Sequence, residues 1–437
     1  MNIIVAGAGK VGFNLAKTLC IGHNVILIDK NAEALHSIQE SLDILPIKGN
    51  VEDSKTYKNL PDKEIDLFIA VTNIDNINLI AILMADAVLN IKRRFIRLQK
   101  HFYNESIIKA RLNIDEIIFP TKLTSTTIAS LLDYPKANNV KSFKYTKHKL
   151  VSVRVSQNIS HLQKNLNEFA LIGIERDKEF FIPSNNTQIK ANDLIYLFGH
   201  KEYIRTICAE LELEDISNIQ KCVIFGGEEL GVSISKELLK INREVKLIEK
   251  DLTLCKKADE ELGGKASIIN SKYGTYDIFE NEGLENADIF IAATNNDEYN
   301  IIKCLEAKDK GIKKVVAVNN KLEYYNLMHS LGIIVVRGPK MSAYKKIMEE
   351  VSSSAVVIHK SFCGAKASVF MRKIFPNSKL INKKIESLKL EETVTFFMRN
   401  EILYLFDQKI VLQEKDLIIT FCTSKKTTRV EQWIYGL

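Results

Sequence analysis

Short apolar runs rich in β-branched residues alternate with amphipathic stretches along the first third of the chain. The runs "NIIVAG", "NVILID" and "DLFIAVT" are typical of buried strands, whereas "VGFNLAKTLCI" and "EALHSIQES" have the apolar spacing of helices. Strands and helices that alternate in this way indicate βαβ units and a parallel sheet with helices on both faces. The pattern therefore predicts an α/β fold of the Rossmann-like, doubly wound class.

The pattern changes near residue 140, where "KLVSVRVS", "FALIGIERDKEFFIP" and "DLIYLFG" indicate the short strands of a small α+β domain. A basic stretch rich in structure-breaking residues, 134–149, marks the change. We interpret this stretch as a linker or a solvated sheet edge, because either explains its lysines more simply than a phosphate-binding patch does.

The second half of the chain repeats the first with a shift of about 220 residues. "VAGAGKVGFNLAKTL" corresponds to "IFGGEELGVSISKEL", "IDLFIAVTNIDNIN" to "ADIFIAATNNDEYN", and "IKANDLIYLFG" to "LQEKDLIITFC". The matches run in the same order through both halves, which indicates a duplication. The expected domains are two of the Rossmann-like class, at 1–135 and 219–350, each followed by a small α+β domain, at 136–212 and 354–437.

A glycine fingerprint, "GAGKVG", lies between the first predicted strand and helix. In such a motif Gly7 permits the tight turn, Gly9 lets a pyrophosphate approach the backbone, and Gly12 lets the helix pack closely on the sheet. Asp29 ends the second predicted strand, where a carboxylate can accept hydrogen bonds from a ribose and disfavours a 2′-phosphate, so NAD is expected rather than NADP. The alternative is a strand, turn and helix whose glycines serve packing alone.

Three other sequence segments end predicted strands at the same edge of the sheet. Thr72, Asn73 and Asp75 lie in "AVTNIDNIN", and such residues are also those that cap a helix, but the repeat keeps them in the same order, which favours a ligand role. Asn50 ends "KGN" and could line the adenine end of the crevice. Arg97, in "FIRLQ", is a further candidate, with an ordinary surface arginine as the alternative.

The second fingerprint, "GGEELG", differs from the first at the position that matters most for a phosphate. Glu228 replaces Gly9 and is followed by Glu229, although Glu249 keeps an acidic residue in the position of Asp29. At about 4 Å and an effective dielectric constant near 20, two like charges repel by roughly 4 kcal/mol, about a thousandfold in affinity. The second half also has valine where the first has Arg97. We therefore expect one working dinucleotide site per chain, unless a cation held by the two glutamates restores phosphate binding.

Composition narrows the function classes. The formal charge of +7 is spread along the chain, so a solvated surface is expected rather than a nucleic-acid partner. Seven scattered cysteines without a CxxC pair argue against disulfides and zinc and for a reducing cytosol. The sequence begins with a predicted strand, so no signal peptide is expected. The apolar run at 77–91 has the pattern of a helix but is too short to span a bilayer, so any membrane part must come from a partner.

Two alternatives to a ligand-sensing protein would each need residues or elements of their own. A NAD-dependent oxidoreductase with an unidentified substrate would need an acid or base beside the nicotinamide, and no histidine lies in a motif-like setting. A DNA-binding redox sensor would need a helix-turn-helix or a concentrated basic helix, and neither is evident in the sequence. The sequence therefore favours a protein that binds without turnover, with no catalytic residues and no metal.

These features resemble the cytosolic regulatory subunits of the bacterial Trk potassium-uptake system, which carry tandem RCK (KTN) domains. The resemblance covers essentially the whole chain and rests on "GAGKVG" with Asp29, "VTNIDNIN", "FP" at 119–120, "GP" at 338–339 and "DLIYLFG". It implies NAD(H) as ligand, with ATP or ADP as further possibilities, and nucleotide contacts at Gly7, Ala8, Gly9, Lys10, Val11, Gly12, Asp29, Asn50, Thr72, Asn73 and Arg97.

The same resemblance implies a partner and a location. Members of this family form a ring under a membrane-embedded potassium transporter and alter its gating. The expectation is therefore a homo-dimer or homo-tetramer in the cytoplasm, peripheral to the inner face of the cell membrane, with small domains that contribute dimer contacts or a second effector site.

Overall fold

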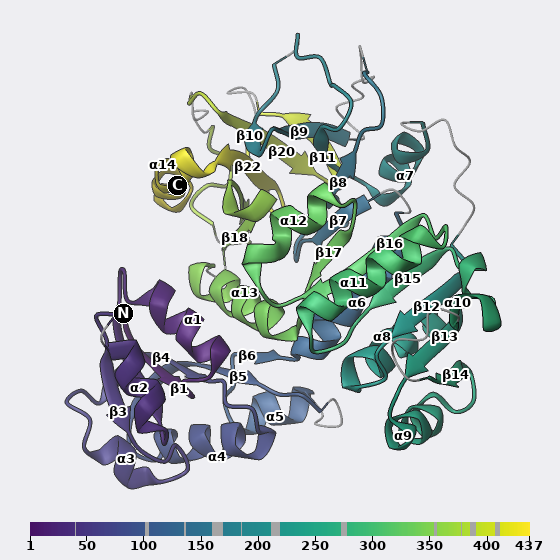
Figure 1. Ribbon diagram of the computed structural model, residues 1–437. Coiled ribbons are helices and arrows are strands. Elements are labelled where there is room, and N and C mark those ends of the chain that lie inside the picture. The colour runs from purple at the N-terminus through teal and green to yellow at the C-terminus, as the bar shows by residue number, and fades with distance from the viewer. Residues whose placement is uncertain are drawn as a thin grey trace. The chain divides into compact units, whose positions relative to one another are not determined.

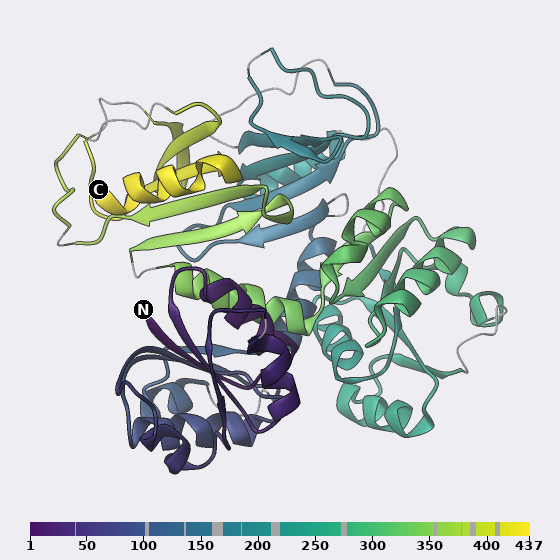
Figure 2. The same cartoon turned by 60° about the vertical axis from the view of Figure 1, so that its left-hand side comes forward.

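The computed structural model describes residues 1–39, 41–100, 105–134, 137–159, 169–184, 186–210, 219–271, 278–353, 356–376, 378–384, 390–406 and 411–437. These residues form two compact units (Figure 1; turned view in Figure 2). Unit 1 contains Met1–Thr126 with Lys221–Met348, and unit 2 contains Thr127–Gln220 with Glu349–Leu437. Each unit thus combines one segment from each half of the repeat. The predicted boundaries at 135, 136, 212 and 354 lie outside the described residues, and the division into four domains stays a prediction.

The first α/β fold of unit 1 is a six-stranded sheet in the order β3-β2-β1-β4-β5-β6, with every neighbouring pair parallel. Its elements are β1 (Asn2–Ala6), α1 (Lys10–Leu19), β2 (Asn24–Asp29), α2 (Ala32–Gln39), β3 (Leu45–Lys48), α3 (Ser54–Lys58), β4 (Glu64–Ala70), α4 (Asp75–Asp86), β5 (Asn90–Arg97), α5 (Glu105–Arg111), β6 (Glu116–Ile118) and α6 (Pro120–Leu132). The strand order reverses between β1 and β4, and a crevice opens at the carboxyl ends of the strands where it does so.

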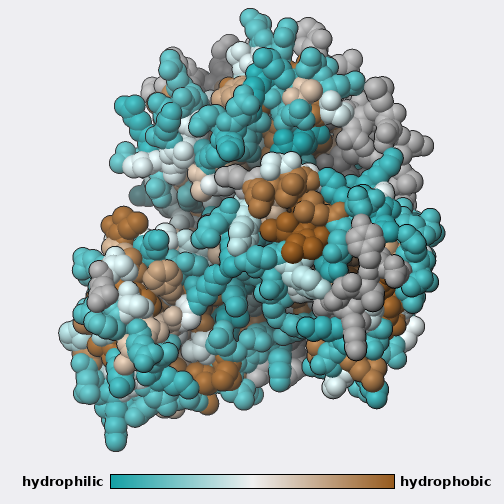
Figure 3. All heavy atoms as spheres, viewed as in Figure 1, coloured by the Kyte–Doolittle hydropathy of each residue, from teal (hydrophilic) through white to brown (hydrophobic). Residues whose placement is uncertain are grey.

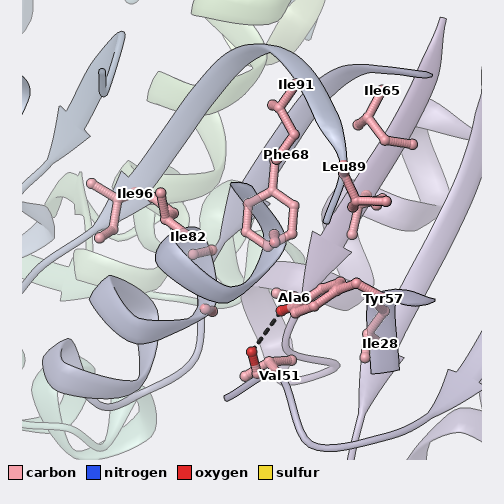
Figure 4. Close-up of a cluster of buried hydrophobic side chains, with 14 of the residues drawn as sticks. Ala6, Ile28, Val51, Tyr57, Ile65, Phe68, Ile82, Leu89, Ile91 and Ile96 are labelled. Atoms are coloured by element: carbon pink, nitrogen blue, oxygen red, sulfur yellow. Dashed lines mark hydrogen bonds between the residues drawn. The ribbon is translucent and has the colours of Figure 1, made fainter. Parts of the chain in front are cut away.

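The core of this fold also holds one loop of the crevice in place. Tyr57 and Phe68 pack edge to face, with ring centroids 6.0 Å apart, among the isoleucine and leucine side chains drawn in Figure 4. The Tyr57 hydroxyl donates a 2.6 Å hydrogen bond to the Val51 carbonyl oxygen, and burial raises the pKa of this phenol. The loop after β3 is therefore anchored from inside the core.

The second α/β fold of unit 1 has the same topology, β14-β13-β12-β15-β16-β17, again with parallel pairs throughout. Its elements are β12 (Lys221–Phe225), α8 (Glu229–Lys240), β13 (Glu244–Glu249), α9 (Leu252–Leu262), β14 (Ser267–Asn270), α10 (Ile278–Asn281), β15 (Ile289–Ala292), α11 (Asp297–Asp309), β16 (Lys314–Asn319), α12 (Tyr325–Ser330), β17 (Ile334–Arg337) and α13 (Pro339–Ser352). The predicted fold class is confirmed, and the sequence repeat is also a repeat of topology.

Unit 2 contains two five-stranded antiparallel sheets, β10-β9-β11-β8-β7 and β18-β19-β22-β20-β21. The elements of the first are β7 (Ala137–Ser142), β8 (Lys149–Arg154), β9 (Phe169–Arg176), β10 (Glu179–Phe181), β11 (Leu194–Gly199) and α7 (Lys201–Glu210). Those of the second are β18 (Val357–Phe362), β19 (Ala367–Lys373), β20 (Thr393–Arg399), β21 (Ile402–Leu405), β22 (Leu417–Thr423) and α14 (Thr427–Gly436).

The two small sheets share one hydrophobic core. Phe198 of β11 and Phe421 of β22 are both fully buried, and their ring centroids lie 5.3 Å apart. Phe180 of β10 packs in the same way on Phe362 of β18, with centroids 5.4 Å apart. Single side chains thus belong to the core of both copies, and the small sheets stabilise each other.

Two details of the sequence interpretation are corrected by the structure. The basic stretch at 134–149 is not a linker over 137–142, because these residues form β7 at one edge of its sheet, with Ala137 fully buried. A sheet edge was the other alternative. The apolar run at 77–91 is not one helix, since α4 ends at Asp86 and β5 begins at Asn90. Periodicity alone does not separate a helix from the buried strand that follows it.

Exposed apolar side chains gather on one part of unit 1. The space-filling view is largely hydrophilic but shows an apolar area over α11 and α12, where Ile302, Leu305 and Leu327 are exposed (Figure 3). None of the helices in the described ranges combines the length and the apolarity needed to cross a bilayer.

The shared core of unit 2 predicts that its two sheets unfold together. Phe421→Ala removes a fully buried ring and should lower the free energy of unfolding of unit 2 by about 3–5 kcal/mol. Amide hydrogen exchange in mild denaturant should then show β8 and β19 losing protection together. Leu405→Ala, at an exposed position of the same unit, is the control and should change stability by less than about 0.5 kcal/mol. Full protection of β8 in Phe421→Ala would contradict a common core.

Candidate functional site

The first α/β fold has a cavity of about 390 Å³ at the carboxyl ends of β1 to β4, at the reversal of strand order. It brings together six of the residues that the sequence predicts for a nucleotide site: Gly7, Gly9, Asp29, Asn50, Thr72 and Asn73. The rest of the lining is Ile28, Lys30, Gly49, Val51, Glu52, Val71, Ile74 and Ile77. Apolar side chains with a few polar groups at their edge are what a flat heterocyclic ring and its sugar require.

The glycines of the fingerprint meet different constraints. Gly7 has a φ of +112°, and a Cβ there would lie 3.0 Å from the Thr72 backbone nitrogen. A Cβ on Gly12 would lie 1.8 Å from the Gly7 carbonyl oxygen, so this glycine serves the packing of α1 on the loop. Gly9 differs from both, because a Cβ there would meet no atom within 4 Å. The fold itself does not require glycine at this position, and its absence of a Cβ leaves the loop open toward the cavity.

The other predicted residues of the fingerprint do not line the cavity. Val11 is buried in the core of the fold, and Lys10 is exposed in the first turn of α1. Ala8 contributes through its backbone, because its N–H donates a 2.6 Å hydrogen bond to Asp29 Oδ2. Asp29 Oδ1 accepts from the Asn31 N–H at 2.9 Å. Since a carboxylate oxygen accepts more than one hydrogen bond, Asp29 keeps acceptor capacity for hydroxyl groups in the cavity.

A buried asparagine that the sequence interpretation missed organises the loop after β4. Asn78 is 0% exposed; its Oδ1 accepts from the Thr72 N–H and hydroxyl, and its Nδ2 donates to the carbonyl oxygens of Thr72 and Arg97. Asn300 makes the corresponding hydrogen bonds in the second fold. The repeat could have identified this residue, because both halves of the sequence have an asparagine at this position.

The polar residues around it do not cap the helix. The N-cap of α4 is Ile74, which forms no side-chain capping bond. The Asp75 carboxylate instead accepts from the backbone N–H groups of Gln99, at 2.8 Å, and Lys100, at 2.9 Å. The capping alternative is therefore wrong in the first fold, where these residues tie the loop after β4 to the end of β5. In the second fold Asn296 does cap α11, by accepting from the Tyr299 N–H.

Arg97 lies behind the cavity rather than in its wall. The residue is 7% exposed, and Nη1 donates a 3.1 Å hydrogen bond to Oδ1 of Asn73, which does line the cavity. Burial lowers the pKa of the guanidinium, and the negative charges of Asp75 and Glu229 oppose that shift. The surface-arginine alternative is therefore wrong, because the cation is almost fully enclosed.

The second fold keeps the backbone of the fingerprint but changes its side chains. Gly226 has a φ of +110°, close to that of Gly7, and Glu228 has nearly the same φ and ψ as Gly9. The Glu228 carboxylate accepts a hydrogen bond from Nδ2 of Asn295. A negative charge therefore occupies the loop where the first fold leaves open space.

Glu249, which ends β13, is also inaccessible to a ligand. Glu249 is only 3% exposed; its Oε2 accepts from the Gly227 N–H at 2.6 Å, and its Oε1 accepts from the N–H groups of Lys250 and Asp251. Its extra methylene group lies under the loop, where a Cβ on Gly227 would be 2.9 Å from the Glu249 Cγ. The second fold therefore keeps the acid in sequence, but its carboxylate is used by the backbone.

Comparison with known proteins points to one family. The TrkA-N domain model matches residues 3–120 and 222–339, and the TrkA-C domain model matches 153–212. A relative from Vibrio alginolyticus, "Trk system potassium uptake protein TrkA", is 27% identical over 446 residues, covering 98% of this chain and 96% of its own.

Two solved structures share the fold. The "GsuK channel bound to NAD" has a TM-score of 0.63 and 15% identity, and the match covers 100% of this chain and 79% of that one. The "GsuK bound to ADP" has a TM-score of 0.51 and 13% identity, and the match covers 80% and 68%. At these identities the likeness concerns the fold alone.

The buried amide of Asn78 predicts a local loss of order when it is removed. Asn78→Ala leaves the Thr72 N–H and the Arg97 carbonyl oxygen without their partner and should lower the free energy of unfolding of unit 1 by about 1–3 kcal/mol. Amide hydrogen exchange should rise over residues 71–75. The matched variant Asn300→Ala should raise exchange over 293–297 instead. Unchanged exchange at 71–75 in Asn78→Ala would show that the amide does not hold this loop.

Proposed function

The chain belongs to the TrkA-N domain family, and on this basis we propose that it is a nucleotide-sensing regulatory subunit that gates a membrane potassium-uptake transporter. The observation that carries the proposal is the cavity of the first fold, with an intact glycine loop, open space at Gly9 and an accessible Asp29. NAD(H) is the proposed ligand, and ATP or ADP would share its adenosine half.

The lining of the cavity supports a division of roles along the ligand. We assign the ribose hydroxyls to Asp29, the adenine to the apolar side chains beside Asn50, and the pyrophosphate to the backbone at Gly7–Gly9 and the N-terminus of α1. Thr72 and Asn73, at the end of β4, would meet the half of the ligand beyond the pyrophosphate. Arg97, at the end of β5, would act on that half from behind the wall, through its hydrogen bond to Asn73. Lys10, Val11 and Gly12 support the loop rather than contact the ligand.

A protein that binds a nucleotide without catalysing a reaction is consistent with the names of its relatives. The relative from Vibrio alginolyticus is named as a potassium uptake protein and the comparison structures as a channel, not as enzymes. The family agrees with the prediction that the chain is not an enzyme, and the oxidoreductase alternative is set aside.

Regulation by a nucleotide requires two states that bind it differently, because a ligand shifts an equilibrium only by its difference in affinity for the two states. We propose that nucleotide in the first crevice biases the arrangement of the α/β folds and that the transporter senses this bias. The chain would act in the cytoplasm, at the inner face of the membrane. A homo-dimer or homo-tetramer would place four or eight α/β folds in a ring, two from each chain.

The first test is calorimetric titration of the full chain with NADH, NAD and ATP separately. We expect one nucleotide per chain. Gly9→Glu should weaken binding about a thousandfold, because the new carboxylate faces the pyrophosphate. The matched variant Glu228→Gly should leave affinity and stoichiometry unchanged. Two nucleotides per chain, or unaltered binding by Gly9→Glu, would contradict the assignment of the site.

Gating is tested by potassium flux through the partner transporter in vesicles, with and without the chain. Nucleotide should change the flux when the wild-type chain is present and should have no effect with Gly9→Glu. A chain that binds nucleotide but leaves the flux unaltered would contradict the regulatory role.

A further inference from the structure

Arg97 is a buried cation without a carboxylate partner at hydrogen-bond distance. Within the described residues its guanidinium donates only to Oδ1 of Asn73, a neutral group, and its Nε has no acceptor. Asp75 lies nearby, but each of its oxygens already accepts from a backbone N–H, those of Gln99 and Lys100. A buried charge is costly unless it is paired, so a nearby carboxylate that is still free matters for the position of this side chain.

The second α/β fold supplies such a carboxylate. Glu229 begins α8, and Ser233 follows four residues later on the same face of the helix. The Ser233 hydroxyl donates a 3.0 Å hydrogen bond to Oγ of Ser125, a fully buried residue of α6 in the first fold. This hydrogen bond joins α8 of the second fold to α6 of the first. The face of α8 that carries Glu229 is therefore turned toward the first fold.

The electrostatics agree with this placement. The Glu229 side chain forms no hydrogen bond or ion pair with any other described residue. Partial desolvation and the negative charge of Asp75 raise the pKa of Glu229, whereas the positive charges of Lys257 and Arg97 lower it. Glu228, next to it, is engaged instead by Asn295 within the second fold. The two glutamates of "GGEELG" thus face different partners.

We propose that Glu229 of the second fold is the counter-charge of Arg97 and sets the nucleotide preference of the first crevice, by competing with a terminal phosphate for the guanidinium. The inference rests on the proposed function, since it concerns a nucleotide in that crevice. Arg97 ends β5 and donates to Asn73, which lines the cavity, so its positive charge lies directly behind the wall. A nucleoside triphosphate brings more negative charge into the crevice than NADH does, so it depends more on that positive charge. Glu229 therefore disfavours the triphosphate more than the dinucleotide.

The test measures the affinity of the full chain for ATP and NADH by calorimetry in four variants. Glu229→Gln removes the competing charge and should bind ATP about fivefold or more tightly than wild type, with NADH changed by less than about twofold. Glu228→Gln makes the same change of net charge one residue away and should change neither affinity. In the Arg97→Gln background, the additional Glu229→Gln substitution should have no effect, because the proposed influence of Glu229 acts through Arg97.

Each outcome of these titrations supports or contradicts the inference. A preference for ATP in Glu229→Gln that needs Arg97 and is absent in Glu228→Gln supports the inference. Equal ATP affinities in wild type and Glu229→Gln, or the same gain without Arg97, overturn it while leaving the proposed function intact. A wild-type chain that binds neither ATP nor NADH overturns the proposed function and the competition together.

Discussion

One hydrogen bond recurs in both α/β folds and positions their acidic residues: the bond from the glycine loop to the carboxylate that ends the second strand. The N–H of Ala8 donates to Asp29 in the first fold and that of Gly227 donates to Glu249 in the second, each at 2.6 Å. With the shorter aspartate, the carboxylate stays at the rim of the cavity. With the longer glutamate, the carboxylate lies under the loop, and both of its oxygens accept hydrogen bonds from backbone N–H groups. One methylene group thus separates an acid available to a ligand from an acid that serves the fold.

The two copies keep one backbone but differ in the side chains of the glycine loop. Gly226 and Gly231 retain the turn and the helix packing that Gly7 and Gly12 provide in the first copy. The position that differs, Glu228, corresponds to Gly9, which we propose for the pyrophosphate. Because the backbone needs no glycine there, this substitution costs the fold little. The second copy also contacts the first, because Ser233 of α8 donates a hydrogen bond to Ser125 of α6.

The fold was predictable from the sequence because alternation, glycine spacing and the repeat all pointed to the same topology. The six cavity residues were predictable because the carboxyl ends of parallel strands meet at one edge. Asn78 was not, since an asparagine inside an apolar helix shows its role only when two strand ends meet it. The enclosure of Arg97 and the common core around Phe421 likewise depend on contacts between distant segments, which local periodicity does not contain.

The most direct test of one working site per chain is an experimental structure of the protein with NADH bound. Density for the dinucleotide is predicted in the crevice of the first fold only, with the ribose hydroxyls on the Asp29 carboxylate and the pyrophosphate over Gly9. Density at Glu228 in the second fold, or a dinucleotide bound away from Asp29, would contradict the account.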